Sequence, residues 1–228
     1  MTNRIGQIAT VSGRLLKPLE ATPDDIFIED IAQVLSLRCR YNCQIPQFYS
    51  VAQHVSMGVS TLYVNKWSRN LPDLEFARAW FLHDAAEAYL PDVPKYLKPL
   101  LSGFIEMEEK LLDVIFERFG LAGFDRDRLK ELDNKVLATE IRDLQPNWPY
   151  DPVAYGEPFV FKIVAMSPQH AKRLFMEDFE YLFPHEIGWP EPRAPQGLVV
   201  ATEALEALRG RQIGRHARRL PATGQCGY

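Results

Sequence analysis

The chain has 228 residues, of which 46% are hydrophobic and 11% aromatic. This composition supplies enough apolar side chains for a full core and excludes wholesale disorder. The formal net charge of −4 does not indicate nucleic-acid binding. No apolar run is long enough to span a bilayer, and the first residues lack the apolar region of a secretory signal, so no membrane partner is expected. Three cysteines without a CxxC motif favour a reduced, cytoplasmic setting.

The elements expected along the chain are almost all helices. Residues 6–16 predict a short hairpin that turns at Ser12-Gly13. Apolar residues at helical spacing then recur in six segments, and the last of them opens with Ser167 as its N-cap and Pro168 at its first position. The predicted helices cover residues 24–41, 48–67, 74–90, 105–120, 125–144 and 167–183. Residues 158–166, "PFVFKIVAM", predict one strand.

The composition changes near residue 187. "GWPEPRAPQG" is typical of a linker, and the sequence after it becomes basic towards its end. The prediction is therefore one all-α domain over residues 1–186, followed over residues 187–228 by a linker and a mobile basic extension.

The stretch "FLHDAAEAYLPDVPK", residues 81–95, carries ionisable groups within an apolar run. His83 and Asp84 are adjacent, and Glu87 and Asp92 follow them. Buried charges need a compensating partner, and imidazole nitrogen with carboxylate oxygen suits a divalent metal ion. Two ligands are too few for a metal site, so further ligands are needed from elsewhere in the chain.

Two other predicted helices offer those ligands. His54 lies among valine, alanine and methionine in "SVAQHVS", and Asp133 lies between Leu132 and Val136 in "KELDNKVLATE". Taken singly, each of these residues is more often structural than metal-binding. Taken together, two histidines and two aspartates from three helices would complete one ion with open positions for water and substrate.

The ordered pattern His54, His83-Asp84, Asp133 resembles the signature of the HD-domain metal-dependent phosphohydrolases, which have an all-helical fold. The blocks "DDIFIEDIAQVLSLRCRYN", "FYSVAQHVSMGVS", "LHDAAEAYLPDVPKYLK", "MEEKLLDVIFERFGL" and "LDNKVLATEIRDL" are similar to the small nucleotide-hydrolysing members of that family. These members include the YfbR-type 5′-nucleotidases, the YfdR-like proteins and the DatZ-like dATP triphosphohydrolases. The resemblance covers roughly residues 10–185.

The resemblance implies a role for each matching residue. The metal ligands would be His54, His83, Asp84 and Asp133, and the ion would be Zn, Co or Mn. Glu87 and Asp92 match the catalytic carboxylates, with Asp92 preferred for the attacking water and Glu87 in support. Arg40 matches an arginine that binds substrate phosphate, while Lys95 and Lys98 could bind further phosphates. Close relatives often carry Gly-His where this chain has Cys43-Gln44.

The expected function is therefore metal-dependent hydrolysis of 2′-deoxynucleotides. One reaction converts a dNTP to a deoxynucleoside and triphosphate, and the other converts a dNMP to a deoxynucleoside and phosphate. The alternatives are a cyclic-nucleotide or (p)ppGpp hydrolase of the same superfamily and a non-catalytic nucleotide sensor. Only five histidines are present, three of them late in the chain, which counts against a second metal site. Family members commonly form dimers or larger rings, so a homo-oligomer is compatible with the resemblance.

Overall fold

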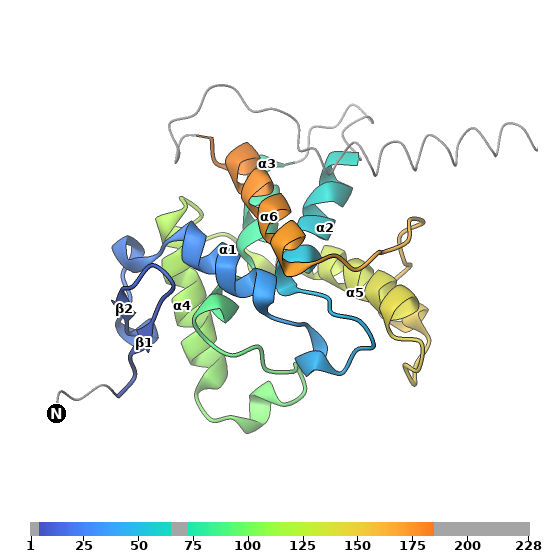
Figure 1. Cartoon of the computed structure of the whole chain (residues 1–228), viewed down its shortest axis with the longest axis horizontal. Coiled ribbons are helices and arrows are strands. Elements are labelled where there is room, and N and C mark those ends of the chain that lie inside the picture. The colour runs from blue at the N-terminus through green and yellow to red at the C-terminus, as the bar shows by residue number, and fades with distance from the viewer. Residues whose placement is uncertain (1–4, 65–72, 185–228) are drawn as a thin grey trace, which may run out of the picture.

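The computed structural model describes residues 5–64 and 73–184, with side chains left out at positions 63 and 64. This part of the chain is mostly helical and contains one two-stranded sheet, in agreement with the predicted all-α class (Figure 1). Its α-helices are α1 (Ile28–Leu37), α2 (Val51–Val64), α3 (Leu74–Leu82), α4 (Phe104–Arg118), α5 (Lys130–Leu144) and α6 (Pro168–Leu182). None of the described helices is both long and apolar enough to cross a membrane. The predicted extension over residues 187–228 and the end of the 48–67 helix lie outside the described residues.

The predicted hairpin is confirmed. Strands β1 (Ile8–Ala9) and β2 (Leu15–Leu16) pair antiparallel, and Gly13 adopts a φ of 82° in the turn between them. The backbone N–H and the hydroxyl of Ser12 both donate to the buried carboxylate of Asp30, each over 2.8 Å. These two bonds anchor the hairpin to α1.

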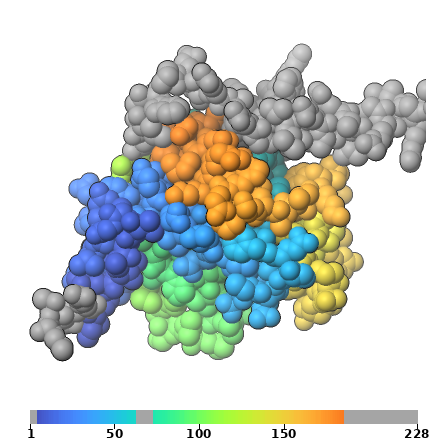
Figure 2. All heavy atoms as spheres, viewed as in Figure 1, coloured from blue at the N-terminus to red at the C-terminus, as the bar shows by residue number. Residues whose placement is uncertain are grey.

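Helix α2 lies at the centre of the helical bundle and contacts α1, α3, α5 and α6. Its Val51, Val55 and Val59 are completely buried, as their helical spacing predicts. Helix α6 begins as expected, because the Ser167 hydroxyl accepts a hydrogen bond from the backbone N–H of His170. In the space-filling view, α6 (orange) lies directly against α1 and α2 (Figure 2).

A close contact between Gly58 and Trp80 sets the distance between α2 and α3. The Trp80 side chain is fully buried, and its indole N–H donates to the carbonyl of Val55 over 2.9 Å. A Cβ atom added at Gly58 would lie 2.1 Å from Trp80 Cε2, well inside van der Waals contact. Glycine is therefore required at this position, and its absent side chain lets α3 approach α2 closely.

The single helix predicted over residues 74–90 is wrong. Helix α3 ends at Leu82, and a short 3₁₀ turn, η5 (Ala85–Ala88), follows it. The backbone N–H and the ring Nδ1 of His83 both donate to the Trp80 carbonyl, which in a continuing α-helix would accept from residue 84. His83 and Asp84 therefore lie at a break between two elements, not side by side on a helix.

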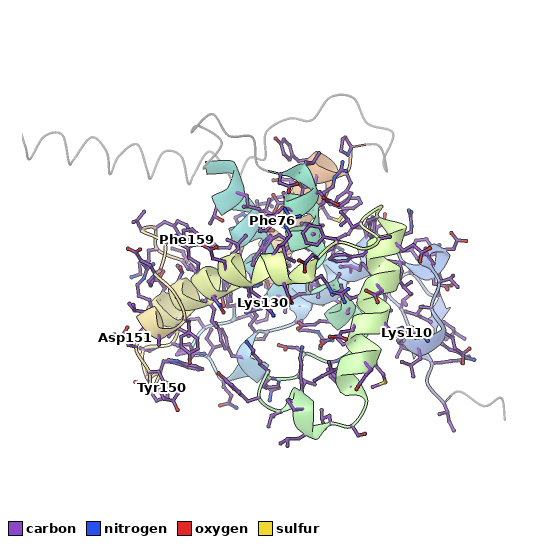
Figure 3. The ribbon with its side chains drawn as sticks, turned by 180° about the vertical axis from the view of Figure 1, so that it is seen from behind. Phe76, Lys110, Lys130, Tyr150, Asp151 and Phe159 are labelled. Atoms are coloured by element: carbon purple, nitrogen blue, oxygen red, sulfur yellow. The ribbon has the colours of Figure 1, made fainter. Side chains whose placement is uncertain are left out.

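Helices α4 and α5 agree more closely with the sequence. Helix α4 ends at Arg118 before Gly120, whose φ is 72°. Helix α5 is preceded by a 3₁₀ turn, η7 (Arg126–Leu129), so the predicted helix over 125–144 is confirmed with a tighter first turn. Seen from behind, α5 runs across the molecule, with Lys130 at one end and Tyr150 and Asp151 beyond the other, away from α4 (Figure 3).

The strand predicted over residues 158–166 is also wrong, because this segment has no neighbouring strand to pair with among the described residues. Side chains from two helices satisfy its backbone instead. Arg142 of α5 donates to the carbonyls of Phe159 and Phe161, each over 2.5 Å. Gln53 of α2 donates to the carbonyl of Val164 over 2.8 Å. Phe161 and Ile163 pack in a small cluster with Tyr49 and Leu144, whereas Val160 and Val164 are exposed.

Candidate metal centre

Two histidines from different elements face each other. His54 lies on α2 and is completely buried, and His83 caps the C-terminal end of α3. Their Nε2 atoms lie 3.4 Å apart. The Trp80 ring stacks on His83 at a centroid distance of 4.3 Å and lies 5.4 Å from the His54 ring. The close approach of α3 to α2 at Gly58 therefore also brings the two imidazoles together.

The hydrogen-bond partners of the two rings assign their tautomers. His83 Nδ1 lies 2.6 Å from the Trp80 carbonyl oxygen, which can only accept, so Nδ1 carries the proton. His54 Nδ1 lies 2.6 Å from Oε1 of Glu140, a carboxylate, and donates to it in the same way. In both neutral rings the Nε2 atom then carries a lone pair, and the two lone pairs point into the same space.

Carboxylate oxygens complete this cluster of acceptor atoms. Asp133 Oδ1 lies 3.6 Å from His54 Nε2, and the Asp84 oxygens lie 3.4 Å from His83 Nε2 and 3.8 Å from His54 Nε2. Ligand atoms about 2.1 Å from one ion are separated by about 3.0 Å at right angles and about 3.4 Å at the tetrahedral angle. The observed separations of 3.4 to 3.8 Å approach these values.

The group His54, His83 and Asp133 can hold a metal ion, since each offers a ligand atom within 4.8 Å of the others. Three of the four predicted ligands therefore meet in this group. Asp84 lies beside it and also accepts a 3.3 Å hydrogen bond from Arg40. Burial would raise the pKa of Asp84, but the Arg40 guanidinium, and the His83 and His54 rings when they are protonated, lower that pKa to about 2. A cation between the rings would act in the same direction.

The two predicted catalytic carboxylates lie next to Asp84. Glu87 is only 6% exposed in η5, and its Oε2 atom has no hydrogen-bond partner in the part of the chain that the structure describes. Burial, together with the charges of Asp84 and Asp92, raises the pKa of Glu87 well above its usual range. Burial also raises the pKa of the half-buried Asp92. A bound cation would stabilise these carboxylates in their charged forms.

The predicted substrate-binding residues differ in their placement. The Arg40 guanidinium is mostly buried between Asp84 and Glu140. Burial would lower the pKa of the Lys98 ammonium, but its hydrogen bonds to both oxygens of Glu108, over 2.7 and 2.8 Å, and the nearby charges of Glu87 and Asp84 raise that pKa. Lys95 is exposed and makes no hydrogen bond or ion pair with any described residue. The structure thus brings Arg40 and Lys98, but not Lys95, to the carboxylates.

The residues that follow α1 form a segment with an unusual backbone. Tyr41, Asn42 and Cys43 all have positive φ values, of 57°, 50° and 61°. This left-handed conformation costs a non-glycine residue about 1–2 kcal/mol, so surrounding contacts must hold it. The Arg40 backbone N–H donates to the Tyr49 carbonyl over 2.9 Å, and the Tyr41 hydroxyl donates to Glu140 over 2.5 Å.

Glu140, in the middle of α5, is the residue of the site that the motifs did not indicate. Its side chain is completely buried, yet His54, Arg40 and Tyr41 stabilise its charge. Burial alone would raise the pKa of Glu140, but these partners lower it to about 2. A signal was present in the sequence, because Glu140 lies seven residues after Asp133 and so on the same helix face, between Ala138 and Ile141, which are both buried.

Comparison with models of known protein families gives no match. Among curated proteins, the chain is similar to an Escherichia coli protein named "Uncharacterized protein YfdR". The two are 39% identical over 178 residues, which cover 77% of this chain and 94% of that protein. An uncharacterized protein of Rhodobacter capsulatus is 37% identical over 116 residues, covering 49% of this chain and 57% of its own length. Neither name states an activity.

Proposed function

The chain belongs to the family of the Escherichia coli protein YfdR, and from its candidate metal centre we propose that it is a metal-dependent phosphohydrolase of the HD-domain type that acts on 2′-deoxynucleotides. The observation that carries this proposal is the convergence of His54 Nε2, His83 Nε2 and the carboxylates of Asp84 and Asp133, with both protons of the neutral rings directed elsewhere. Four acceptor atoms in such proximity repel one another unless a cation lies between them.

The chemistry of the donor set fits a divalent ion such as Zn, Co or Mn. When bound, such an ion would neutralise phosphate charge and lower the pKa of a water molecule. Arg40 would bind phosphate oxygens with its planar guanidinium. Asp92 would orient the attacking water and accept its proton, and Glu87 would support it from the buried side. Water adds to phosphorus, the bond from phosphorus to the sugar 5′-oxygen breaks, and the departing oxygen takes up a proton.

Two reactions fit this centre, because both break the same type of bond. A dNTP would yield a deoxynucleoside and triphosphate, and a dNMP would yield a deoxynucleoside and orthophosphate. Arg40 and Lys98 both lie close enough to Asp84 to interact with its charge. Two cations near one proposed metal ligand favour a substrate with several phosphates. The dNTP reaction is therefore the first one to test.

A substrate panel tests the proposal. The full chain is incubated with dNTPs, dNMPs and ribonucleotides in the presence of Mn, Co or Zn, and the products are separated by anion exchange. Triphosphate from one dNTP establishes the first reaction, and orthophosphate from dNMPs establishes the second. Asp133→Ala should abolish turnover, whereas Asp24→Ala, which changes an exposed aspartate far along the chain from every ligand, should not. Absence of hydrolysis across the panel, with metal bound, would contradict the proposal.

A further inference from the structure

Glu140 contacts a predicted metal ligand with one carboxylate oxygen and the segment after α1 with the other. Its Oε1 atom accepts from His54 Nδ1 over 2.6 Å. Its Oε2 atom accepts from the Tyr41 hydroxyl over 2.5 Å and lies 3.3 Å from Arg40 Nε. The side chain is completely buried, so water does not compete for these contacts. One carboxylate therefore joins a metal ligand to the segment that carries the proposed phosphate-binding arginine.

We propose that Glu140 is a positioning residue that holds His54 for the metal and, at the same time, holds the phosphate-binding arm, residues 38–44, in its left-handed conformation. This inference rests on the proposed function and deepens it. Glu140 itself does not touch the metal or the substrate. It acts through His54 on one side and through Tyr41 and Arg40 on the other.

The contact with His54 determines which nitrogen faces the metal. An imidazole whose Nδ1–H is bound by a carboxylate keeps its Nε2 lone pair free and cannot rotate about its side-chain bonds without losing that bond. His54 is the residue whose Nε2 atom lies within 3.8 Å of all three other predicted ligands. Loosening its ring would therefore disturb the three ligand pairs that include His54.

The contacts of Oε2 hold the arm against its own backbone preference. Three consecutive residues with positive φ do not keep that conformation without external restraint. The Tyr41 hydroxyl and the Arg40 guanidinium flank this turn, and both are directed to Glu140. A second restraint is the bond from the Gln145 side chain to the Gln44 carbonyl, 3.1 Å long, which also comes from the end of α5. Helix α5 thus supplies both the ligand Asp133 and the support for the arm.

Two variants of the full chain separate the two roles. Glu140→Gln keeps the shape but removes the charge, and its NH2 group, which cannot accept, replaces one of the two oxygens that accept separately from His54 and Tyr41. Tyr41→Phe removes only the hydroxyl contact of the arm. Each variant is titrated with Mn and with Co, and then, at saturating metal, with inorganic tripolyphosphate. Thermal unfolding without metal checks that the fold is retained.

Glu140→Gln should weaken metal binding by about 10–100-fold, as the loss of a partner of a ligating histidine usually does. Tyr41→Phe should leave metal affinity little changed and weaken tripolyphosphate binding. Unchanged metal affinity in Glu140→Gln, or unchanged tripolyphosphate binding in Tyr41→Phe, would overturn the inference. The first result tests the positioning of His54, and the second tests the support of the arm. Neither binding assay needs turnover. A chain that binds metal tightly but hydrolyses nothing would therefore contradict the proposed function and leave the inference about Glu140 intact.

Discussion

The contact between Gly58 and Trp80 makes a sharp prediction about how the fold supports the metal centre. In Gly58→Ala, the new Cβ atom would lie 2.1 Å from Trp80 Cε2 and 2.2 Å from Nε1. Restoring van der Waals contact of about 3.5 Å requires the indole and α2 to separate by about 1.4 Å. Such a shift would also stretch the 2.9 Å bond from the indole N–H to the Val55 carbonyl.

The magnitude follows from these changes. Overpacking a core costs about 1–3 kcal/mol, and a buried donor without a partner costs about 1–3 kcal/mol more. Alanine regains roughly 1 kcal/mol through its higher helix propensity. We therefore expect Gly58→Ala to lower the free energy of unfolding by about 1–5 kcal/mol. Because His83 follows Trp80 by one turn, metal affinity should also fall.

Urea unfolding followed by circular dichroism measures the stability change, and a Co titration measures the affinity. The matched control is Trp80→Phe, whose smaller ring leaves room beside α2. In that background Gly58→Ala should cost less than in the original chain, so the two changes should not be additive. If Gly58→Ala alone left both stability and metal affinity unchanged, the contact would not set the spacing of the helices.

Two further predictions concern charged groups. Burial raises the pKa of Asp178 on α6 to about 8, so the folded chain keeps a proton that the unfolded chain loses near pH 4, and stability should fall as pH rises from about 4 to 8. Asp178→Asn should remove about 1.4 kcal/mol per pH unit from this slope in urea titrations, and an unchanged slope would count against the buried carboxyl as its source. Lys98→Ala should raise KM for the preferred nucleotide by about tenfold, the usual effect of losing a charged hydrogen bond. Lys95→Ala should raise KM less, because Lys95 is exposed; equal effects would contradict this placement.

Most of the helices could be predicted because their apolar residues recur at the helical period. The boundaries of α4 and α6 were also readable, since Gly120, Ser167 and Pro168 act locally. The break in the helix after Leu82 could not be predicted from the sequence. It depends on the His83 ring bonding to the Trp80 carbonyl, a contact that the apolar pattern of residues 74–90 does not reveal.

Some residues of the candidate site could be predicted from the sequence and others could not. His54, His83 and Asp133 could be picked out because histidine and aspartate are unusual within apolar helical segments, and the structure brings these three together. Glu140 was not picked out, because a single glutamate on a helix is ordinarily a solvated residue. Its spacing of seven residues from Asp133 puts it on the same helix face, but only the packing of α5 beside α2 and the arm distinguishes it from a solvated glutamate. The left-handed turn at Tyr41–Cys43 contains no glycine and so gave no local signal.

The most direct test of the metal centre is a measurement of bound metal and of the stability that it confers. The full chain and a His83→Ala variant are stripped with chelator, dialysed against Mn, Co or Zn, and analysed for metal content and thermal unfolding. We expect one ion per chain. At a free concentration of about 100 times Kd, that ion should add about 2.7 kcal/mol of stability and raise Tm by several degrees, and His83→Ala should lose both effects. No bound ion, or an equal rise of Tm in both proteins, would show that His54, His83, Asp84 and Asp133 are not metal ligands.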